Sequence, residues 1–385
     1  MKRRICVFTG GRAEYGLLKP LLDELNKAPS VELKLLVSGM HLSREFGLTY
    51  ENIEADGYTC DECVEMILSS DTPTGVCKSM GLGMIGFSEA LVRLKPDLLV
   101  ILGDRFESMA AATSAMVCRV PIVHIQGGEM TLGAIDDHIR HAITKMSWLH
   151  IVTTEVYRKR VIQLGENPKR VFNYGALNTD AMKKIKLLSK NELEKEINFS
   201  LGSRSLLVTF HPVTLEKNTS EKYFQQILDV IDSYEGLNII FTKTNADTEG
   251  RIINQMIDKY VEKNPQNTIA FKSMGQLRYI SSLYYITAVV GNSSSGIIET
   301  PTFKVPTINI GEREEGRIIA DNIICCEQNV DSIKSALDKA LSHAFRESLV
   351  NMSNPYEQDN TTLSIAKLLK ECELPKLTKK EFYDL

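Results

Sequence analysis

The sequence predicts an α/β protein built from two doubly wound parallel sheets. Apolar runs without alternation, such as Asp97–Gly103 (DLLVILG), are typical of strands that are covered on both faces. Each run is followed by a glycine or polar turn and then by a longer amphipathic segment, and this alternation indicates parallel sheets flanked by helices. The pattern restarts near Leu206, so two such sets are expected. A chain of 385 residues is long enough to give each set its own core.

The first half contains six expected strands and three expected helices. The strands are short apolar runs bounded by turn residues: Arg4–Thr9, Leu33–Ser38, Asp97–Gly103, Ile122–Gln126, Leu149–Thr153 and Val171–Tyr174. The helices are Ala13–Asn26, Phe106–Cys118 and Asp136–Ser147. The third helix has an apolar stripe, which we expect to face the core, formed by Ile135, Ile139, Ile143 and Met146.

The second half repeats the pattern. Its expected strands are Leu206–His211, Asn238–Thr242, Thr287–Gly291 and Val305–Ile310, together with a buried strand at Cys325 and Cys326. Its expected helices lie around Lys222–Tyr234, Thr248–Glu262, Gln276–Tyr285 and Asp331–His343. The polar, charge-rich stretch Leu177–Ser205 predicts the seam. We therefore expect a first domain of residues 1–177, a second of residues 178–357, and a tail of residues 358–385 whose helix near Leu363–Glu373 returns to the first domain.

Composition excludes several classes of function. The 45 basic and 49 acidic residues give a net charge of −4, which provides no electrostatic footprint for DNA, RNA or an acidic membrane face. A local basic pocket for one small anion remains possible. The apolar run Ile5–Thr9 is too short for a signal peptide, and other runs fall short of the roughly 18 residues of a membrane span, so we expect a cytoplasmic protein. Eight cysteines without zinc-site spacing are expected to be reduced, and we expect no metal site.

Polar residues follow the expected strands of the first half, where ligands bind in open parallel sheets. After the first strand, FTGGRAEYG with Arg12 is either a phosphate-facing loop or a tight turn. The motif LGDRFE places Asp104 and Arg105 at a strand end. There the Asp104 carboxylate either caps the next helix or has a functional role in a cleft. In VHIQGGE, two glycines leave Glu129 projecting beyond the strand, whereas His124 within the strand is interpreted as a satisfied core histidine.

The segment IDDHIRHAITK begins a helix with two acidic residues. Asp136 and Asp137 suit an N-terminus, which explains one aspartate more easily than two. Asp137 and His141 are four residues apart and share a helical face, so the carboxylate can orient the ring or shift its pKa. The alternative is a surface ion pair.

The second half offers groups for an anion. His211 ends a strand in FHPVT, where it either donates to a phosphate or fills a turn. GNSSSGIIE places hydroxyl groups and free N–H groups at a helix start, with Glu299 about one turn on, where it could accept from ribose hydroxyls. Arg313 and Arg317 in NIGEREEGR are either site residues or surface charge. Together these features suit a nucleotide-sugar enzyme with its cleft between two domains.

The motifs, in order, resemble those of the hydrolysing UDP-N-acetylglucosamine 2-epimerases of sialic- and legionaminic-acid-type sugar biosynthesis. The resemblance runs across essentially the whole chain through RAEYG, SGMHLSREFG, LGDRFE, HIQGGE, IDDHIRHAITK, FHPVT, TNADTEG and GNSSSGIIE. It implies a GT-B-like architecture of two Rossmann-like domains with a cleft between them. It also implies elimination of the nucleoside diphosphate to a glycal, followed by rehydration to N-acetylmannosamine. The implied partner is a nucleotide sugar, no cofactor is implied, and relatives suggest a homodimer or homotetramer.

The resemblance also implies roles for individual residues. Asp104, Glu129, Asp136 and Asp137 resemble the family's catalytic carboxylates, with acid and base left unassigned, and His211 resembles the residue that faces the diphosphate. The remaining positions resemble binding residues: Ser293 and Ser294 for the diphosphate, Glu299 for the ribose, His41 in the first-domain cleft, and Arg12, Arg105, Asn245 and Arg313 for the substrate or its nucleotide.

One departure from the family pattern stands at position 126. This chain has Gln126, where animal relatives have Glu and some bacterial relatives have His. An amide cannot shuttle a proton, so Glu129 is expected to carry more of the acid–base work. Four alternatives remain open: the same chemistry on GDP- or UDP-linked N,N'-diacetylbacillosamine, a non-hydrolysing epimerase, a GT-B glycosyltransferase, and a non-catalytic nucleotide-sugar sensor.

Overall fold

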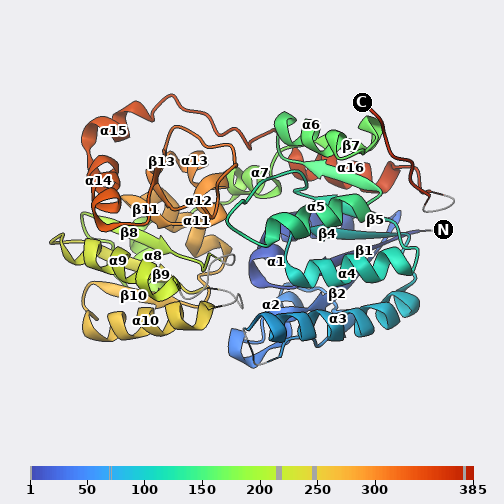
Figure 1. Ribbon diagram of the computed structural model, residues 1–385, viewed down its shortest axis with the longest axis horizontal. Coiled ribbons are helices and arrows are strands. Elements are labelled where there is room, and N and C mark those ends of the chain that lie inside the picture. The colour runs from blue at the N-terminus through green and yellow to red at the C-terminus, as the bar shows by residue number, and fades with distance from the viewer. Residues whose placement is uncertain (1, 69, 71, 214–218, 245–248, 376–378) are drawn as a thin grey trace. The chain divides into compact units, whose positions relative to one another are not determined.

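The computed structural model describes residues 2–68, 70, 72–213, 219–244, 249–375 and 379–385. The chain divides into two compact units. The first consists of Met1–Glu129, Asp136–Ala181 and Tyr356–Leu385, and the second of Met130–Ile135 and Met182–Pro355. Each unit contains one parallel sheet with helices on both of its faces (Figure 1), which confirms the predicted α/β class.

The sheet of the first unit has seven strands in the order β3-β2-β1-β4-β5-β6-β7, and all its pairings are parallel. The strands are β1 Arg3–Thr9, β2 Val31–Ser38, β3 Glu62–Val64, β4 Leu98–Leu102, β5 Ile122–Ile125, β6 Leu149–Val152 and β7 Val171–Asn173. Every residue of β4 is buried, as its uninterrupted apolar run predicts. The strand order reverses between β1 and β4, and in such sheets ligands bind beyond the carboxyl ends at this switch point.

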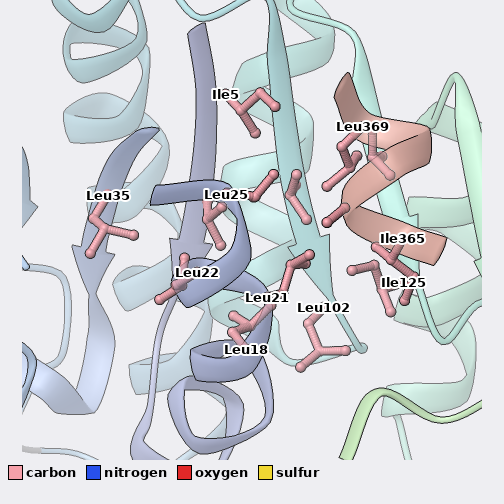
Figure 2. Close-up of a cluster of buried hydrophobic side chains, with 14 of the residues drawn as sticks. Ile5, Leu18, Leu21, Leu22, Leu25, Leu35, Leu102, Ile125, Ile365 and Leu369 are labelled. Carbon is pink, nitrogen blue, oxygen red and sulfur yellow. The ribbon is translucent and has the colours of Figure 1, made fainter. Parts of the chain in front are cut away.

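Helices cover both faces of this sheet. On one face, leucines of α1 (Arg12–Asn26) meet Ile365 and Leu369 of α16 (Thr361–Glu371), so the end of the chain packs in the first unit (Figure 2). The other face is covered by α3 (Pro73–Leu94), α4 (Phe106–Val117) and α5 (Asp136–Met146). Ile139 and Ile143 of α5 are buried there as predicted, whereas Ile135 precedes the helix and is exposed. Shorter helices complete the unit: α2 Tyr50–Ala55, α6 Glu155–Gln163 and the first part of α7 Leu177–Lys184.

Helix α3 was not predicted, because its 22 residues include four glycines, which are poor helix formers. Three of them have no free space for a Cβ. It would lie 2.5 Å from Ser70 Oγ at Gly75, 2.9 Å from Met66 Cε at Gly83 and 2.4 Å from Val64 Cγ1 at Gly86. The helix starts with a side-chain cap, in which the Thr72 hydroxyl accepts from the Gly75 amide at 3.1 Å. Tertiary contact with β3 therefore outweighs the low intrinsic propensity.

Lys380, near the C-terminus of the chain, contacts residues at the end of α5. Lys380 Nζ donates to the carbonyl of Ser147 at 2.9 Å and to Glu166 Oε1 at 2.9 Å. Glu166 also accepts from Lys145 at 2.8 Å and from His150 at 2.9 Å. Burial alone would raise the pKa of Glu166, but these hydrogen bonds outweigh it and hold the pKa at about 2.

The second unit has a six-stranded sheet in the order β10-β9-β8-β11-β12-β13, again with parallel pairings throughout. Its strands are β8 Ser205–Thr209, β9 Asn238–Thr242, β10 Thr268–Phe271, β11 Ala288–Gly291, β12 Thr307–Ile310 and β13 Ile323–Cys326. Its helices are α8 Lys190–Ile197, α9 Ser220–Asp232, α10 Gly250–Lys263, α11 Gln276–Tyr285, α12 Ser294–Ile298, α13 Thr300–Phe303, α14 Val330–Leu341 and α15 His343–Ser348. Here the order reverses between β8 and β11.

The stretch Leu177–Ser205, where the sequence predicts the seam, contains α7 and α8. Helix α8 begins with a capping box in which Ser189 and Glu192 bond reciprocally. Leu193 and Ile197 of α8 are buried in the core of the second unit. The strand at Cys325 and Cys326 is confirmed, but Cys325 is exposed because β13 is an edge strand. Within the described residues, no helix is both long enough and apolar enough to cross a membrane.

Candidate functional site

The ends of β1 and β2 approach closely at two glycines. Gly39 has φ +60°, and a Cβ there would lie 2.5 Å from the Gly10 carbonyl oxygen. That oxygen accepts from the Met40 amide at 2.9 Å, which joins the two strand ends. Arg12, the first residue of α1, is half-buried, and this burial lowers the pKa of its guanidinium. This loop therefore brings one cation to the switch point of the first sheet, where the sequence placed a possible phosphate contact.

Two buried carboxyl groups lie beside this loop. Glu14 Oε2 accepts from the Gly10 amide at 2.7 Å, and Glu107 Oε2 accepts from Arg105 Nε at 3.3 Å. Burial, followed by the charge of Glu107, raises the pKa of Glu14 to about 8. Arg105, predicted to bind substrate, is thus held by a carboxylate of its own unit.

The raised pKa of Glu14 predicts how stability depends on pH. Because the folded chain keeps this proton up to about pH 8 while an unfolded chain loses it near 4.5, the free energy of unfolding falls as pH rises through that interval. A Glu14→Gln variant lacks this decline and is expected to be more stable than the native chain above pH 8, by on the order of a few kcal/mol. Urea unfolding at several pH values measures the difference. The exposed residue Glu51, changed in the same way, is the matched control, and parallel pH profiles for native and Glu14→Gln chains would contradict the expectation.

His41 is fully buried next to β1. Its Nε2 lies 3.0 Å from Thr9 Oγ1 and its Nδ1 lies 2.8 Å from Thr49 Oγ1. Burial lowers the pKa of the imidazole to about 4, so the ring is neutral at pH 7. Both ring nitrogens are within hydrogen-bonding distance of threonine hydroxyls of the first unit. Direct contact of His41 with a ligand therefore stays a prediction, and these hydrogen bonds do not favour it.

The turn after β5 positions Glu129. Gly128 has φ +79°, and a Cβ there would lie 2.7 Å from the Tyr157 carbonyl oxygen, so only glycine fits. The following Glu129 is buried, and its Oε1 accepts from the Thr153 hydroxyl at 2.9 Å. His124 within β5 is buried too, with Thr144 Oγ1 at 3.1 Å and the Gly103 carbonyl at 2.8 Å, as expected of a satisfied core histidine.

Arg140 of α5 contacts three of the predicted site residues: Asp104, Glu129 and Asp137. Its guanidinium is almost fully buried and forms an ion pair with Asp104 through Nη2. Its Nη1 donates to Asp137 Oδ1 at 3.1 Å and to the backbone carbonyl of Glu129 at 3.0 Å. The side chains of Asp104 and Asp137 and the backbone of Glu129 therefore meet at one cation, which balances the two aspartate carboxylates in a poorly solvated place.

Asp137 also faces His141 along α5. Its Oδ2 lies 3.6 Å from His141 Nε2, in agreement with the predicted shared helical face. Burial lowers the pKa of His141, although the charge of Asp137 opposes this. Asp136 lies half-buried in the first turn of the same helix.

In the second unit, Asn292 joins the carboxyl ends of β8 and β11. Its Oδ1 accepts from the His211 amide at 2.7 Å, and its Nδ2 donates to the His211 carbonyl at 2.8 Å. The strands meet this closely because Gly291, at φ +145°, has no Cβ; one would lie 1.8 Å from the Thr209 carbonyl oxygen. His211 is thereby held at the switch point of the second sheet.

Hydroxyl groups follow at the start of α12. Ser293 Oγ and Ser295 Oγ lie 3.1 Å apart, and the hydroxyl of the half-buried Tyr279 donates to Ser295 at 2.9 Å. Ser293 and Ser294 are partly exposed, whereas Glu299 lies half-buried at the junction of α12 and α13. Burial, followed by the charge of Glu299, raises the pKa of Tyr279, so its hydroxyl stays a donor.

Arg313 reaches the same strand end. Its Nη1 donates to the Asn292 carbonyl at 3.0 Å and pairs with Glu314, which also pairs with Arg317. The segment Met130–Ile135 packs against this turn, because the Leu132 amide donates to the Glu315 carbonyl at 3.2 Å. The chain thus leaves the first unit directly after Glu129, contacts the turn that carries Arg313, and returns at Asp136.

The structure assembles two groups of predicted residues. Asp104, Glu129 and Asp137 meet in the first unit, and His211, Ser293 and Arg313 surround Asn292 in the second. Asn245 lies outside the described residues. Sequence reasoning missed Arg140 and Asn292. Arg140 lies four residues after Asp136, and Asn292 directly follows a strand, but the partners of both come from elements distant in sequence.

Known proteins are similar to this chain in sequence and in fold. A family model described as UDP-N-acetylglucosamine 2-epimerase matches residues 23–370. A GDP/UDP-N,N'-diacetylbacillosamine 2-epimerase (hydrolyzing) of Campylobacter jejuni is 41% identical over 385 residues, covering 100% of both chains. A UDP-N-acetylglucosamine 2-epimerase of Neisseria meningitidis serogroup B is 33% identical over 342 residues, covering 89% of this chain and 88% of the relative.

The solved UDP-GlcNAc 2-epimerase of Neisseria meningitidis bound to UDP-GlcNAc has the same fold. Its TM-score is 0.79 at 18% identity, covering 95% of this chain and 99% of that one. With its two Rossmann-like sheets, the chain has the GT-B-like fold that the resemblance implied.

Proposed function

The chain belongs to the UDP-N-acetylglucosamine 2-epimerase family, and from this membership we propose that it is a hydrolysing 2-epimerase. It acts on a nucleoside-diphosphate-linked N-acetylated amino sugar. The observation that carries the proposal is that the carboxylates of Asp104 and Asp137 and the backbone carbonyl of Glu129 all contact the buried guanidinium of Arg140. The homo-oligomeric state, a homodimer or homotetramer, is part of the same proposal.

The proposed reaction has two stages. First, the bond between C1 and the diphosphate oxygen breaks as C2 loses its proton, which yields a glycal and the nucleoside diphosphate. Water then adds its hydroxyl group to C1, and a proton returns to C2 from the opposite face. These two reaction stages need groups that accept and return protons near C1 and C2, and carboxylates can do both.

Within this proposal, Glu129 and Asp104 move protons at C2 and at the departing oxygen, and Asp137 orients the attacking water. Arg140 is a positioning residue, because its contacts are with these carboxylate residues. Asp136, beside Asp137 in the first turn of α5, is a further candidate for proton transfer.

We assign the diphosphate to the second unit. Backbone N–H groups and hydroxyls at the start of α12, with the imidazole of His211, provide donors to an anion at the carboxyl ends of β8 and β11. Ser293 and Ser294 are the proposed diphosphate ligands and Glu299 the ribose ligand. Arg12, Arg105, Asn245 and Arg313 remain candidates for the nucleotide, and His41 is the weakest candidate because its ring is enclosed.

Two sugars are candidates for the substrate. UDP-N-acetylglucosamine, converted to N-acetylmannosamine and UDP, is the one implied by the sequence motifs. Full-length identity of 41% to the Campylobacter jejuni enzyme, against 33% to the Neisseria meningitidis enzyme, favours GDP- or UDP-linked N,N'-diacetylbacillosamine instead. We therefore propose the diacetylated sugar as the first substrate to test.

Proton NMR of each nucleotide sugar with the enzyme in heavy water tests the proposal. We expect free nucleoside diphosphate, a free sugar of manno configuration, and deuterium at C2. Release of an epimerised sugar still linked to its nucleotide would identify a non-hydrolysing epimerase. Turnover that requires an added acceptor would identify a glycosyltransferase, and an unchanged sugar with retained UDP binding would identify a sensor.

A serine substitution tests the diphosphate assignment. Ser294→Ala is expected to weaken UDP binding about tenfold, the value of one hydrogen bond to a charged group, while kcat at saturating substrate changes little. Titration calorimetry gives the dissociation constant. The exposed serine Ser348 of α15 provides the matched alanine control. Equal UDP affinity in the native and Ser294→Ala proteins would remove Ser294 from the site.

A further inference from the structure

Two arginines hold the turn that carries Glu129. Arg160 of α6 donates through Nη1 to the Gly128 carbonyl at 2.5 Å, and Arg140 of α5 donates to the Glu129 carbonyl at 3.0 Å. These carbonyls belong to the two peptide groups on either side of the Glu129 Cα. Because each peptide group is planar, fixing both of them sets the direction in which the Glu129 side chain leaves the backbone.

Helix α6 also supports this turn by packing. A Cβ at Gly128 would lie 2.8 Å from Val161 Cγ2, so the turn lies directly against the helix. Thr153, which precedes the N-cap residue of α6, donates to Glu129 Oε1 at 2.9 Å. The corner between β6 and α6 therefore contacts both the backbone of the turn and the carboxylate that follows it.

The charge of Arg160 is not balanced by an acidic partner. Its guanidinium lies over the Tyr157 ring, 5.3 Å from the centroid, and in the described part of the chain no carboxylate is within ion-pair distance of it. The nearby Arg158 differs, because it pairs with Glu155 at 3.2 Å and donates to a carbonyl of β7. The positive charge of Arg160 therefore acts on the titratable groups around it.

His141 of α5 is one of those groups. Burial lowers the pKa of its imidazole, and the charge of Asp137 opposes this shift. Arg140, Arg160 and His138 lower the pKa further, so the groups of α5 and α6 that face the ring keep it neutral at pH 7. Its Nδ1 is buried and has no hydrogen-bond partner among the described residues, and its Nε2 lies 3.6 Å from Asp137 Oδ2.

We propose that Arg160 is a positioning residue for the reaction. It orients Glu129 through the Gly128 carbonyl, and its charge prevents His141 from becoming an imidazolium that would bind Asp137 as an ion pair. This inference rests on the proposed function, which places proton transfer at Glu129 and the orientation of water at Asp137. Arg160 acts through these residues, as Arg140 does from the other side of the turn.

Steady-state release of nucleoside diphosphate tests the orientation of Glu129. Arg160→Met keeps an unbranched side chain but removes the donor and the charge. We expect kcat to fall about 10- to 100-fold, because a displacement of about 1 Å suffices for the larger loss, while UDP affinity stays native. Arg160→Lys keeps a charged donor and should recover part of kcat. Lys159→Met, at an exposed position of the same helix, is the matched control and should turn over like the native enzyme.

The pH dependence of kcat tests the effect of charge. Without the cation at position 160 the pKa of His141 rises, so in Arg160→Met the decline of kcat at low pH should begin roughly one pH unit higher. Arg160→Lys keeps the charge and should keep the native profile. In a His141→Gln background the titrating group is gone, and adding Arg160→Met should not move the decline. A shift that persists in this background overturns the assignment to His141.

The outcomes distinguish this inference from the proposed function. A native enzyme that releases no nucleoside diphosphate overturns the proposed function and this inference with it. If the native enzyme turns over, a native kcat and pH profile in Arg160→Met overturn this inference alone, even where urea unfolding shows a less stable variant. An equal fall in UDP affinity and kcat would make Arg160 a binding residue and would overturn it as well. Circular dichroism verifies that each variant is folded.

Discussion

A Glu129→Gln enzyme is expected to lose about 10²- to 10⁴-fold in kcat, the usual contribution of one acid–base group, while it still binds UDP. The amide is isosteric with the carboxylate, and its oxygen can keep the hydrogen bond from Thr153, now 2.9 Å from Glu129 Oε1. The backbone carbonyl that accepts from Arg140 is unchanged. The substitution therefore removes the proton-transfer group while these two hydrogen bonds can remain. Steady-state release of nucleoside diphosphate measures kcat, and calorimetry measures UDP affinity.

The control for this variant addresses the neighbouring amide at position 126. Gln126→Ala removes a side chain on the same turn that cannot transfer a proton, and its kcat should fall far less than that of Glu129→Gln. Near-normal turnover in Glu129→Gln would remove Glu129 from the chemistry. Loss of UDP affinity together with kcat would point instead to a role in binding.

An Arg140→Met enzyme is expected to lose both turnover and stability. The almost fully buried guanidinium contacts the carboxylates of Asp104 and Asp137 and the backbone carbonyl of Glu129, so its removal takes away the cation that the two aspartates share. Breaking a buried ion pair costs about 3–5 kcal/mol. Asp104 and Asp137 keep 21% and 14% of their side-chain surface exposed, so we expect the lower end of that range. Denaturant unfolding and kcat together measure the two effects.

Arg140→Lys separates positioning from charge. A lysine keeps the positive charge but cannot reach several acceptors in the fixed fork of a guanidinium. We expect Arg140→Lys to recover most of the stability and only part of kcat, and both variants to show an altered pH dependence of kcat. A methionine variant with native kcat and a native pH profile would show that Arg140 does not position these groups.

Much of the fold follows from local sequence. Strands β1, β4, β8 and β11 were predicted to within a few residues because uninterrupted apolar runs between turn residues have few other interpretations. Helix α8 was not predicted, because its charged residues resemble a linker. Its signals were present in Ser189 and Glu192 at capping-box spacing and in Leu193 and Ile197 at helical spacing. For α3 the sequence was misleading. Its glycines lower the helix propensity, but Gly83 and Gly86 leave space for the side chains of Met66 and Val64, which only the folded chain brings near.

The candidate site was predictable at strand ends and less so elsewhere. Asp104, Glu129 and His211 were chosen as candidates because each lies at or just beyond the end of an expected strand, and the carboxyl ends of parallel strands collect functional groups. Arg140 was missed because its importance rests on contacts with residues 36 and 11 positions away. For His41 the motif suggested a ligand, but Thr9 and Thr49 occupy both ring nitrogens.

Neither unit is one uninterrupted stretch of chain, since the first is made of three segments and the second of two. A gene fragment that encodes either unit completely would have to be spliced from separated pieces. Recombination at a single breakpoint cannot transfer a whole unit to another protein. We therefore expect homologues to diverge by substitution within both units together rather than by modular exchange of one of them.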